Sequence, residues 1–130
     1  MFLLDTNVCV DFALARSEHL RERVRRFYAS GLSISAITLA ELRAGARHPG
    51  ADPEDARRLD SLVRVLQLRD FDERAADTYG RIARSAGLKR RSFDQLIAAH
   101  ALALDLTLVT RDERDFATIP GLRVENWTKD

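Results

Sequence analysis

The sequence has few of the residues that build disulfides, zinc sites or membrane spans. Cys9 is its only cysteine, which excludes an internal disulfide and is typical of the reducing cytoplasm. The histidines, His19, His48 and His100, are scattered, so no zinc cluster is predicted. No apolar run approaches the roughly 20 residues that cross a bilayer, and no basic segment precedes the first apolar run. We therefore expect a cytoplasmic protein without a membrane span or secretory signal.

Lysine is also scarce and occurs only at positions 89 and 129. Nearly every other cationic residue is therefore an arginine. Arginine suits phosphate recognition through its planar, bidentate fork. A GC-rich genome, which raises arginine and alanine together, explains the general excess. One local cluster, Lys89, Arg90 and Arg91, is either a set of RNA phosphate contacts or a solvated loop. The 130 residues, 45% of them hydrophobic, predict one domain over residues 1–130.

The apolar segments predict strands that alternate with helices, which is the pattern of an α/β fold with a parallel sheet between helices. Strands are expected at 2–4, 32–34, 66–68, 106–110 and 122–124. Helices are expected at 8–15, 17–28, 35–47, 54–65, 72–86 and 93–104. Thr6 or Asn7 is expected to cap the first helix, and Ser92 with Gln95 forms a predicted capping box for the last.

Four acidic residues follow the expected strands or begin an expected helix. Asp5 closes the first strand, Asp112 follows the 106–110 strand, and Glu41 lies about one helical turn beyond the second strand. Because parallel strands place their carboxyl ends at one edge of a sheet, these three are expected to converge there. Asp94 joins them if its helix begins at the same edge.

Each acid also has an ordinary structural explanation. Asp5 can cap a helix, and Glu41 can form a capping box with Thr38. Asp94 suits the positive end of a helix dipole, and Asp112 suits a turn. Taken together, however, neighbouring carboxylates repel one another unless a cation lies among them, and Mg²⁺ or Mn²⁺ prefers such oxygen ligands. The set therefore predicts metal-assisted hydrolysis of a phosphodiester.

Two residues with reactive side chains are not assigned a catalytic role. His100 lies six residues after Asp94, among apolar neighbours, so it is interpreted as a packed or interface histidine. Cys9 has no neighbours that would activate a nucleophile. The sequence also lacks a Gly-rich phosphate loop.

Four segments in order resemble the PIN-domain ribonucleases and, more narrowly, the VapC-type toxins of bacterial toxin–antitoxin pairs. They are Leu3-Leu4-Asp5-Thr6-Asn7, Ser35-Ala36-Ile37-Thr38-Leu39-Ala40-Glu41-Leu42, Phe93-Asp94-Gln95-Leu96-Ile97-Ala98-Ala99-His100-Ala101-Leu102 and Leu108-Val109-Thr110-Arg111-Asp112. The likeness extends from Met1 to about Trp127. It implies a PIN-like α/β/α sandwich around a five-stranded parallel sheet.

The resemblance also implies a Mg²⁺ or Mn²⁺ site. The residues that match the family's acids are Asp5, Glu41 and Asp94. Asp112 matches the fourth acid in one version of the pattern, whereas Asp115 falls where other members carry theirs. Thr110 matches the strand-end hydroxyl that steadies the first aspartate, and Thr6 is a second supporting residue.

Family members cut RNA endonucleolytically as homodimers, and each is silenced by an antitoxin whose tail enters the active-site groove. The resemblance thus implies an RNA substrate, a VapB-like antitoxin, and DNA contact only through that antitoxin. The dimer surface is predicted on the apolar side of the 54–65 helix and on a stripe formed by Leu20, Val24, Phe27 and Tyr28.

Two other functions fit parts of the sequence. A non-catalytic PIN-type module that binds RNA or protein usually lacks part of the acid set, which is whole here. An aspartyl-phosphate enzyme would use Asp5 as nucleophile. A haloacid-dehalogenase-type phosphatase would then need a second aspartate where Asn7 stands, and a response-regulator receiver would need a lysine better placed than Lys89. A metal-dependent endoribonuclease of a type II toxin–antitoxin pair is the predicted function.

Overall fold

The computed structural model describes residues 1–46, 50–85 and 92–129. Its strands form one parallel sheet in the order β3-β2-β1-β4-β5. Their bounds are β1 (Phe2–Leu4), β2 (Leu32–Ser35), β3 (Gln67–Arg69), β4 (Thr107–Val109) and β5 (Val124–Glu125). The chain direction across the sheet reverses beside β1, which lies between β2 and β4. In open α/β sheets the carboxyl ends of the strands at such a reversal form the usual ligand site.

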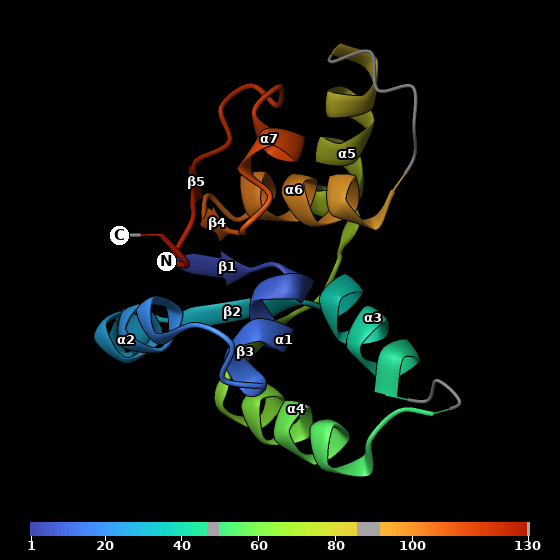
Figure 1. Cartoon of the computed structure of the whole chain (residues 1–130). Helices are drawn as coiled ribbons and strands as arrows, with labels where there is room; N and C mark the ends of the chain where they lie inside the picture. The colour runs from blue at the N-terminus through green and yellow to red at the C-terminus, as the bar shows by residue number, and fades with distance from the viewer. Residues whose placement is uncertain (47–49, 86–91, 130) are drawn as a thin grey trace.

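Helices cover both faces of the sheet, which confirms the predicted α/β/α sandwich. Their bounds are α1 (Thr6–Ala13), α2 (Glu18–Phe27), α3 (Ala36–Ala46), α4 (Pro53–Val65), α5 (Glu73–Ser85), α6 (Phe93–Ala103) and α7 (Glu113–Phe116), with a 3₁₀ turn at Tyr28–Ser30. In Figure 1, α1, α2 and α4 lie below the sheet, and α5, α6 and α7 lie above it. The strand and helix bounds agree with the sequence prediction to within about two residues, except where α7 replaces the expected polar turn.

The apolar run at the start of the chain is buried on both sides, as its composition predicts. Phe2 and Leu4 belong to the core beneath α1, α2 and α4, whereas Leu3 belongs to the core beneath α6. This division follows from the period of two in a strand, in which successive side chains point to opposite faces. Among the described residues, the helices are too short or too polar to cross a bilayer.

The α2 part of the predicted dimer stripe belongs to this core, whereas Tyr28, in the 3₁₀ turn that follows α2, is 51% exposed. Leu20 is fully buried and Val24 is 5% exposed, so the prediction that they contact a second chain is wrong. Phe27 packs against Phe2 and Trp127, with ring centroids 5.1 and 5.3 Å away. The stripe was misassigned because periodicity shows that a helix face is covered without showing what covers it.

Candidate active site

Asp5 ends the central strand and is held by both of its carboxylate oxygens. Oδ1 accepts a hydrogen bond from the backbone N–H of Thr6 at 2.8 Å, and Oδ2 accepts one from the hydroxyl of Thr110 at 2.8 Å. Asp5 itself is the N-cap of α1, so the predicted cap at Thr6 or Asn7 is wrong. The helix starts earlier than expected because the chain leaves β1 directly into it.

Burial sets the protonation behaviour of Asp5. Asp5 is only 2% exposed, and this burial raises the pKa of its carboxyl group from 3.8 to about 6. The hydrogen bonds from Thr110 and Thr6 oppose this rise, whereas the charges of Asp94 and Glu41 add to it. The ionised carboxylate is therefore held in a place that disfavours it unless a cation is present.

This pKa predicts how stability depends on pH in a chelating buffer. Between pH 4 and 6 the folded chain keeps a proton on Asp5 that the unfolded chain releases. The free energy of unfolding should therefore fall as pH rises through this window, by about 3 kcal/mol at most, and stay lower above it. Urea unfolding at pH 4 and pH 8 measures the change. Asp5→Asn should show a smaller fall, and an identical fall in both proteins would contradict the assignment to Asp5.

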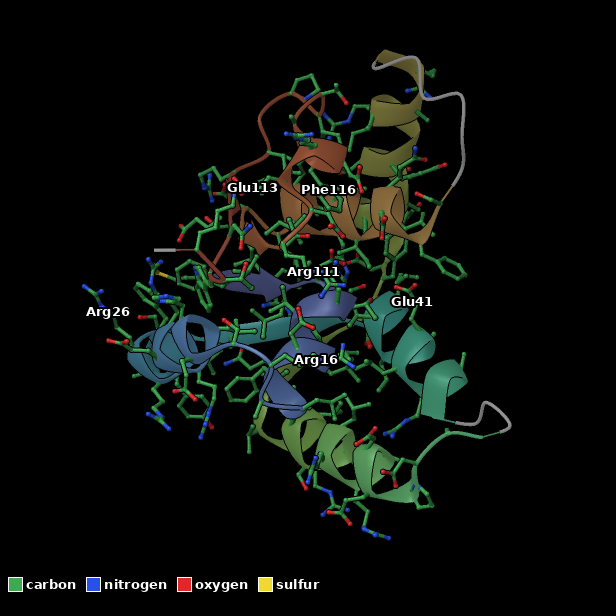
Figure 2. All side chains as sticks on the ribbon, in the orientation of Figure 1. Arg16, Arg26, Glu41, Arg111, Glu113 and Phe116 are labelled. Carbon is green, nitrogen blue, oxygen red and sulfur yellow. The ribbon has the colours of Figure 1, made fainter. Side chains whose placement is uncertain are left out.

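Glu41 is joined to the same strand end through Thr6. The Thr6 hydroxyl donates to Glu41 Oε1 at 2.6 Å and lies 3.4 Å from the hydroxyl of Thr38. Thr38 is fully buried inside α3, which begins at Ala36, so the alternative of a Thr38–Glu41 capping box is excluded. Figure 2 labels Glu41 beside the upper part of α3.

Asp94 lies in the first turn of α6, at the same end of the sheet. It is exposed, yet its pKa is raised, first by partial desolvation and then by the charges of Glu41, Asp115 and Asp112. These charges act on Asp94 only because α6 begins near the carboxyl ends of the strands. The helix that carries Asp94 therefore begins at the edge where the other acids lie, as the sequence analysis required.

Asp112 is fixed by a residue that the sequence analysis did not select as a site residue. Asn7 Nδ2 donates to Asp112 Oδ2 at 2.6 Å, and the Asp112 N–H donates to the Thr110 hydroxyl at 3.1 Å. Asp112 is the N-cap residue of α7, which puts Asp115 in the first turn of that helix. The available signal was the spacing, since Asn7 lies two residues after Asp5 in the first turn of α1.

The oxygen atoms at this edge fit a hard divalent cation. In the described chain, no arginine or lysine forms an ion pair with the five acids, which are Asp5, Glu41, Asp94, Asp112 and Asp115. Asn7 Oδ1 and Gln95 Oε1 are buried without a hydrogen-bond partner, so two further acceptors are unsatisfied. Gln95 thus completes only half of the predicted capping box, in which Ser92 Oγ accepts from the Gln95 N–H.

The acids do not form a closed metal cage. Among residues 1–46, 50–85 and 92–129, no three histidine, cysteine, aspartate or glutamate side chains lie close enough to enclose an ion. Mg²⁺ usually takes one or two carboxylates and keeps several waters, for which Asn7 Oδ1, beside Asp112, is a suitable acceptor. An open, water-rich site is the kind that this donor set can build.

Two other residues considered in the sequence lie away from this chemistry. His100 is fully buried, with Nδ1 2.8 Å from Ser35 Oγ and its ring edge-on to Phe71, which confirms a packed histidine. Burial lowers its pKa. Burial raises the pKa of the Cys9 thiol, which keeps it protonated and unreactive. Lys89, Arg90 and Arg91 lie outside the described residues.

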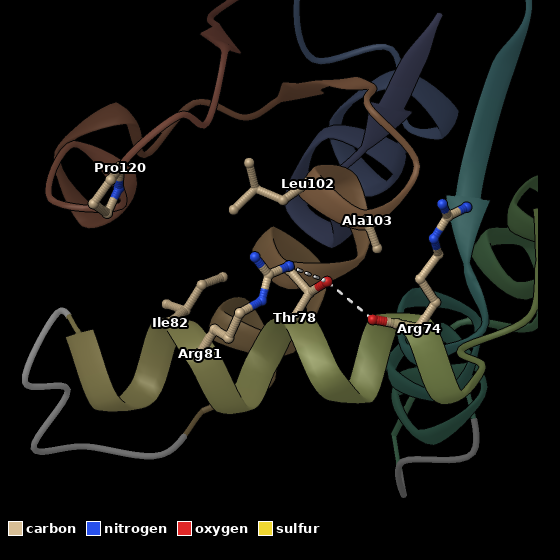
Figure 3. A pocket seen from close by; sticks show the side chains of 7 residues that line it. All are labelled: Arg74, Thr78, Arg81, Ile82, Leu102, Ala103 and Pro120. Carbon is tan, nitrogen blue, oxygen red and sulfur yellow. Dashed lines mark hydrogen bonds between the residues drawn. The ribbon is translucent and has the colours of Figure 1, made fainter.

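Two cavities differ in their relation to the acids. A pocket of about 240 Å³ between α1, α3 and α4 is lined by Thr6 and Glu41 and by apolar side chains that include Val10 and Leu59, so it adjoins the acidic edge. A pocket of about 460 Å³ lies at the other end of α6 from Asp94 (Figure 3). Its lining residues are Arg74, Thr78, Arg81, Ile82, Leu102, Ala103 and Pro120.

Comparison with known sequences identifies similar proteins over almost the whole chain. The family model for the PIN domain matches residues 2–122. The tRNA(fMet)-specific endonuclease VapC of Salmonella typhimurium is 37% identical, and the match covers 97% of each chain. Ribonuclease VapC2 of Rickettsia felis is 33% identical, with 99% of each chain covered.

Comparison with solved structures gives the same result. VapBC2 from Rickettsia felis, bound to a DNA fragment from its promoter, superimposes with a TM-score of 0.87 at 31% identity, over 97% of this chain and 98% of that one. The DNA-bound VapBC of Salmonella typhimurium has a TM-score of 0.87 at 36% identity, over 97% of each chain.

Proposed function

This chain belongs to the PIN domain family, and we propose that it is the toxin of a type II toxin–antitoxin pair, an endoribonuclease that hydrolyses RNA and is neutralised by a VapB-like antitoxin. The observation that carries the proposal is the set of acids at the end of β1, complete and without cationic partners among the described residues. The whole set also argues against the alternative, a non-catalytic PIN-type binding module.

We assign Asp5, Glu41, Asp94 and Asp112 to the binding of Mg²⁺ or Mn²⁺, with Asp115 in a supporting position. A bound divalent ion supplies a hydroxide-like nucleophile at neutral pH and stabilises charge on a phosphoryl oxygen. Thr110 and Thr6 hold the Asp5 carboxylate in one orientation, since each donates to a different oxygen.

The same groups suggest how RNA is admitted. Asp94 and Asp112 are exposed, so a phosphodiester can approach from their side, whereas Asp5 is buried behind them. We place further RNA phosphate contacts on Lys89, Arg90 and Arg91, which precede α6 in sequence and were predicted for this role.

We place the antitoxin tail in the pocket of about 240 Å³ between α1, α3 and α4. Its apolar lining includes Val10, Leu42 and Leu59, and it reaches Glu41, so a bound segment would block the acids. The related VapBC structures contain toxin together with antitoxin, and two are bound to DNA. We propose that this chain contacts DNA only through such a partner, and that the pair acts in the cytoplasm.

Expression in a bacterial host tests the toxin function. We expect the chain alone to arrest growth, and co-expression with the neighbouring small gene to restore it, with both proteins purifying together. Because the relative from Salmonella typhimurium is a tRNA(fMet)-specific endonuclease, initiator tRNA is the test substrate. The purified chain should cleave it in Mg²⁺ and should not cleave it in excess EDTA. A harmless chain that leaves RNA intact under both conditions would favour the binding module.

We also propose a homodimer, formed by a face different from the one expected from sequence. Phe93 is 58% exposed beside a groove of about 460 Å³ that Tyr79, Ser92 and Leu96 complete. An exposed aromatic side chain next to an apolar groove is typical of a protein interface. A surface here would place the Asp94 of each chain near the partner.

Light scattering tests this surface. The wild-type chain should have a mass of about twice 14.7 kDa at micromolar concentration, and Phe93→Ser should shift it towards the monomer because the exposed ring is removed. Tyr28→Ser is the matched control, since Tyr28 is 51% exposed on the face predicted from sequence. If Tyr28→Ser dissociates the dimer and Phe93→Ser does not, the dimer uses the face that contains Tyr28.

A further inference from the structure

The segment that leaves β4 is tied to α1 by an ion pair outside the acid set. A single nitrogen of Arg111, Nη1, donates to Asp11 Oδ2 at 2.7 Å and to Oδ1 at 3.0 Å. The Asp11 side chain is only 6% exposed, whereas that of Arg111 is 46% exposed. Arg16 approaches the same carboxylate at 3.4 Å from the solvent side. Figure 2 labels Arg111 above Arg16, both beside α1.

Arg111 lies between two residues that define the acidic site. Thr110 donates to Asp5, and Asp112 accepts from Asn7. Three consecutive residues after β4 therefore each contact α1 or its N-cap. Of the three contacts, only the Arg111–Asp11 pair lies outside the proposed metal site, so it can hold the segment whether or not an ion is bound.

The geometry would change if the pair were lost. Without Arg111 the segment keeps its backbone hydrogen bond from the Thr110 N–H to Glu125 at 3.0 Å. It loses the one contact with α1 that lies outside the acid set. Asp112 would then be held only by contacts within the acidic edge, from Asn7 to its carboxylate and from its own N–H to the Thr110 hydroxyl. Because the charges of Asp112 and Asp94 repel each other, loss of the outer anchor would allow the Asp112 carboxylate to move outward.

We propose that Arg111, paired with Asp11, is a positioning residue that sets the affinity of the site for its divalent ion by holding Asp112 and Thr110 against α1. This inference rests on the proposed function, because it takes the acids to be the metal ligands. It assigns no contact with RNA to Arg111. Outer partners of metal ligands commonly change metal affinity by roughly 10- to 100-fold when they are removed.

Metal affinity measured without RNA tests the proposal. Mn²⁺ binding is followed by electron paramagnetic resonance for wild type, Arg111→Ala, Asp11→Asn and the double variant. Each single variant should weaken Mn²⁺ binding by roughly 10-fold or more. The double variant should be no weaker than either single variant, because both remove the same pair. Arg16→Ala is the matched control, since it removes a cation from Asp11 without touching the segment after β4, and its affinity should be that of wild type.

Cleavage assays add a second readout. Arg111→Ala should need more Mg²⁺ for half-maximal cleavage and should approach the wild-type rate in excess metal. Arg111→Lys keeps the charge, so it should bind Mn²⁺ more tightly than Arg111→Ala and less tightly than wild type. If Arg111→Ala does not fold, Arg111→Lys takes its place in the comparison. Unchanged Mn²⁺ affinity in Arg111→Ala with weaker RNA binding would overturn the proposal and make Arg111 a phosphate contact. A wild-type chain that binds Mn²⁺ but cleaves no RNA would contradict the proposed function alone, since the affinity comparison needs no RNA.

Discussion

Asp5→Asn should lower the rate of RNA cleavage by at least about 100-fold while the chain stays folded, because the change removes a ligand charge and little else. The asparagine has the same shape and can still accept from the Thr6 N–H through its carbonyl oxygen. The other side of the amide faces the Thr110 hydroxyl, which must then turn to act as the acceptor. The expected loss is therefore in metal binding and catalysis.

The measurement is single-turnover cleavage of initiator tRNA at saturating Mg²⁺, together with circular dichroism to confirm the fold. Asp105→Asn is the matched control. Asp105 adopts a positive φ of 54°, which asparagine tolerates, and it lies at an exposed ion pair with Arg123. Full activity of Asp5→Asn would contradict the nuclease site. Loss of activity in both variants would mean that the assay reports on folding.

Asp5 caps α1, and this structural role is compatible with the proposed role in metal binding. The sequence left open whether it caps a helix or belongs to a site. A carboxylate has two oxygens, and the structure uses one for the Thr6 N–H and the other for Thr110. A short apolar strand followed directly by an acid predicted the position of Asp5, because burial of the strand fixes where its last residue must lie.

The long-range contacts of the site could not be predicted in the same way. Asn7 meets Asp112, and Asp11 meets Arg111, across about 100 residues of sequence. Such pairs depend on β4 returning to lie beside β1, which the alternation of strands and helices permits but does not specify. Local patterns predicted which acids follow strands, whereas their partners come from the strand order.

The surface of α2 shows a second limit. Its stripe of apolar residues has the spacing of a buried helix face, and Leu20 and Val24 are indeed buried. The spacing is the same whether the cover is the chain's own sheet or a second chain. The exposed Phe93 had no periodic signal, because it is one residue at the start of a helix whose neighbours pack inward.

Asp112 and Asp115 are held differently at the start of α7. Asp112 leaves the sheet edge two residues after Thr110 and is held by Asn7 at 2.6 Å. Asp115 lies three residues further on, one turn along α7, so both side chains lie on one face of that short helix. Both charges raise the pKa of Asp94, so both carboxylates lie close enough to act on it electrostatically.

Asp112→Ala should abolish cleavage at every Mg²⁺ concentration, whereas Asp115→Ala should lose roughly 10- to 100-fold and recover in excess Mg²⁺. Asp112 follows the sheet edge directly and is held beside Asn7, so we expect it to be the direct ligand. Asp115 lies three residues later and can act on the ion through a retained water. Cleavage rates measured against Mg²⁺ concentration for both variants separate the two roles. If Asp115→Ala is inactive at every concentration and Asp112→Ala is rescued by excess metal, the roles are reversed, and Asn7 then holds an outer carboxylate and not a ligand.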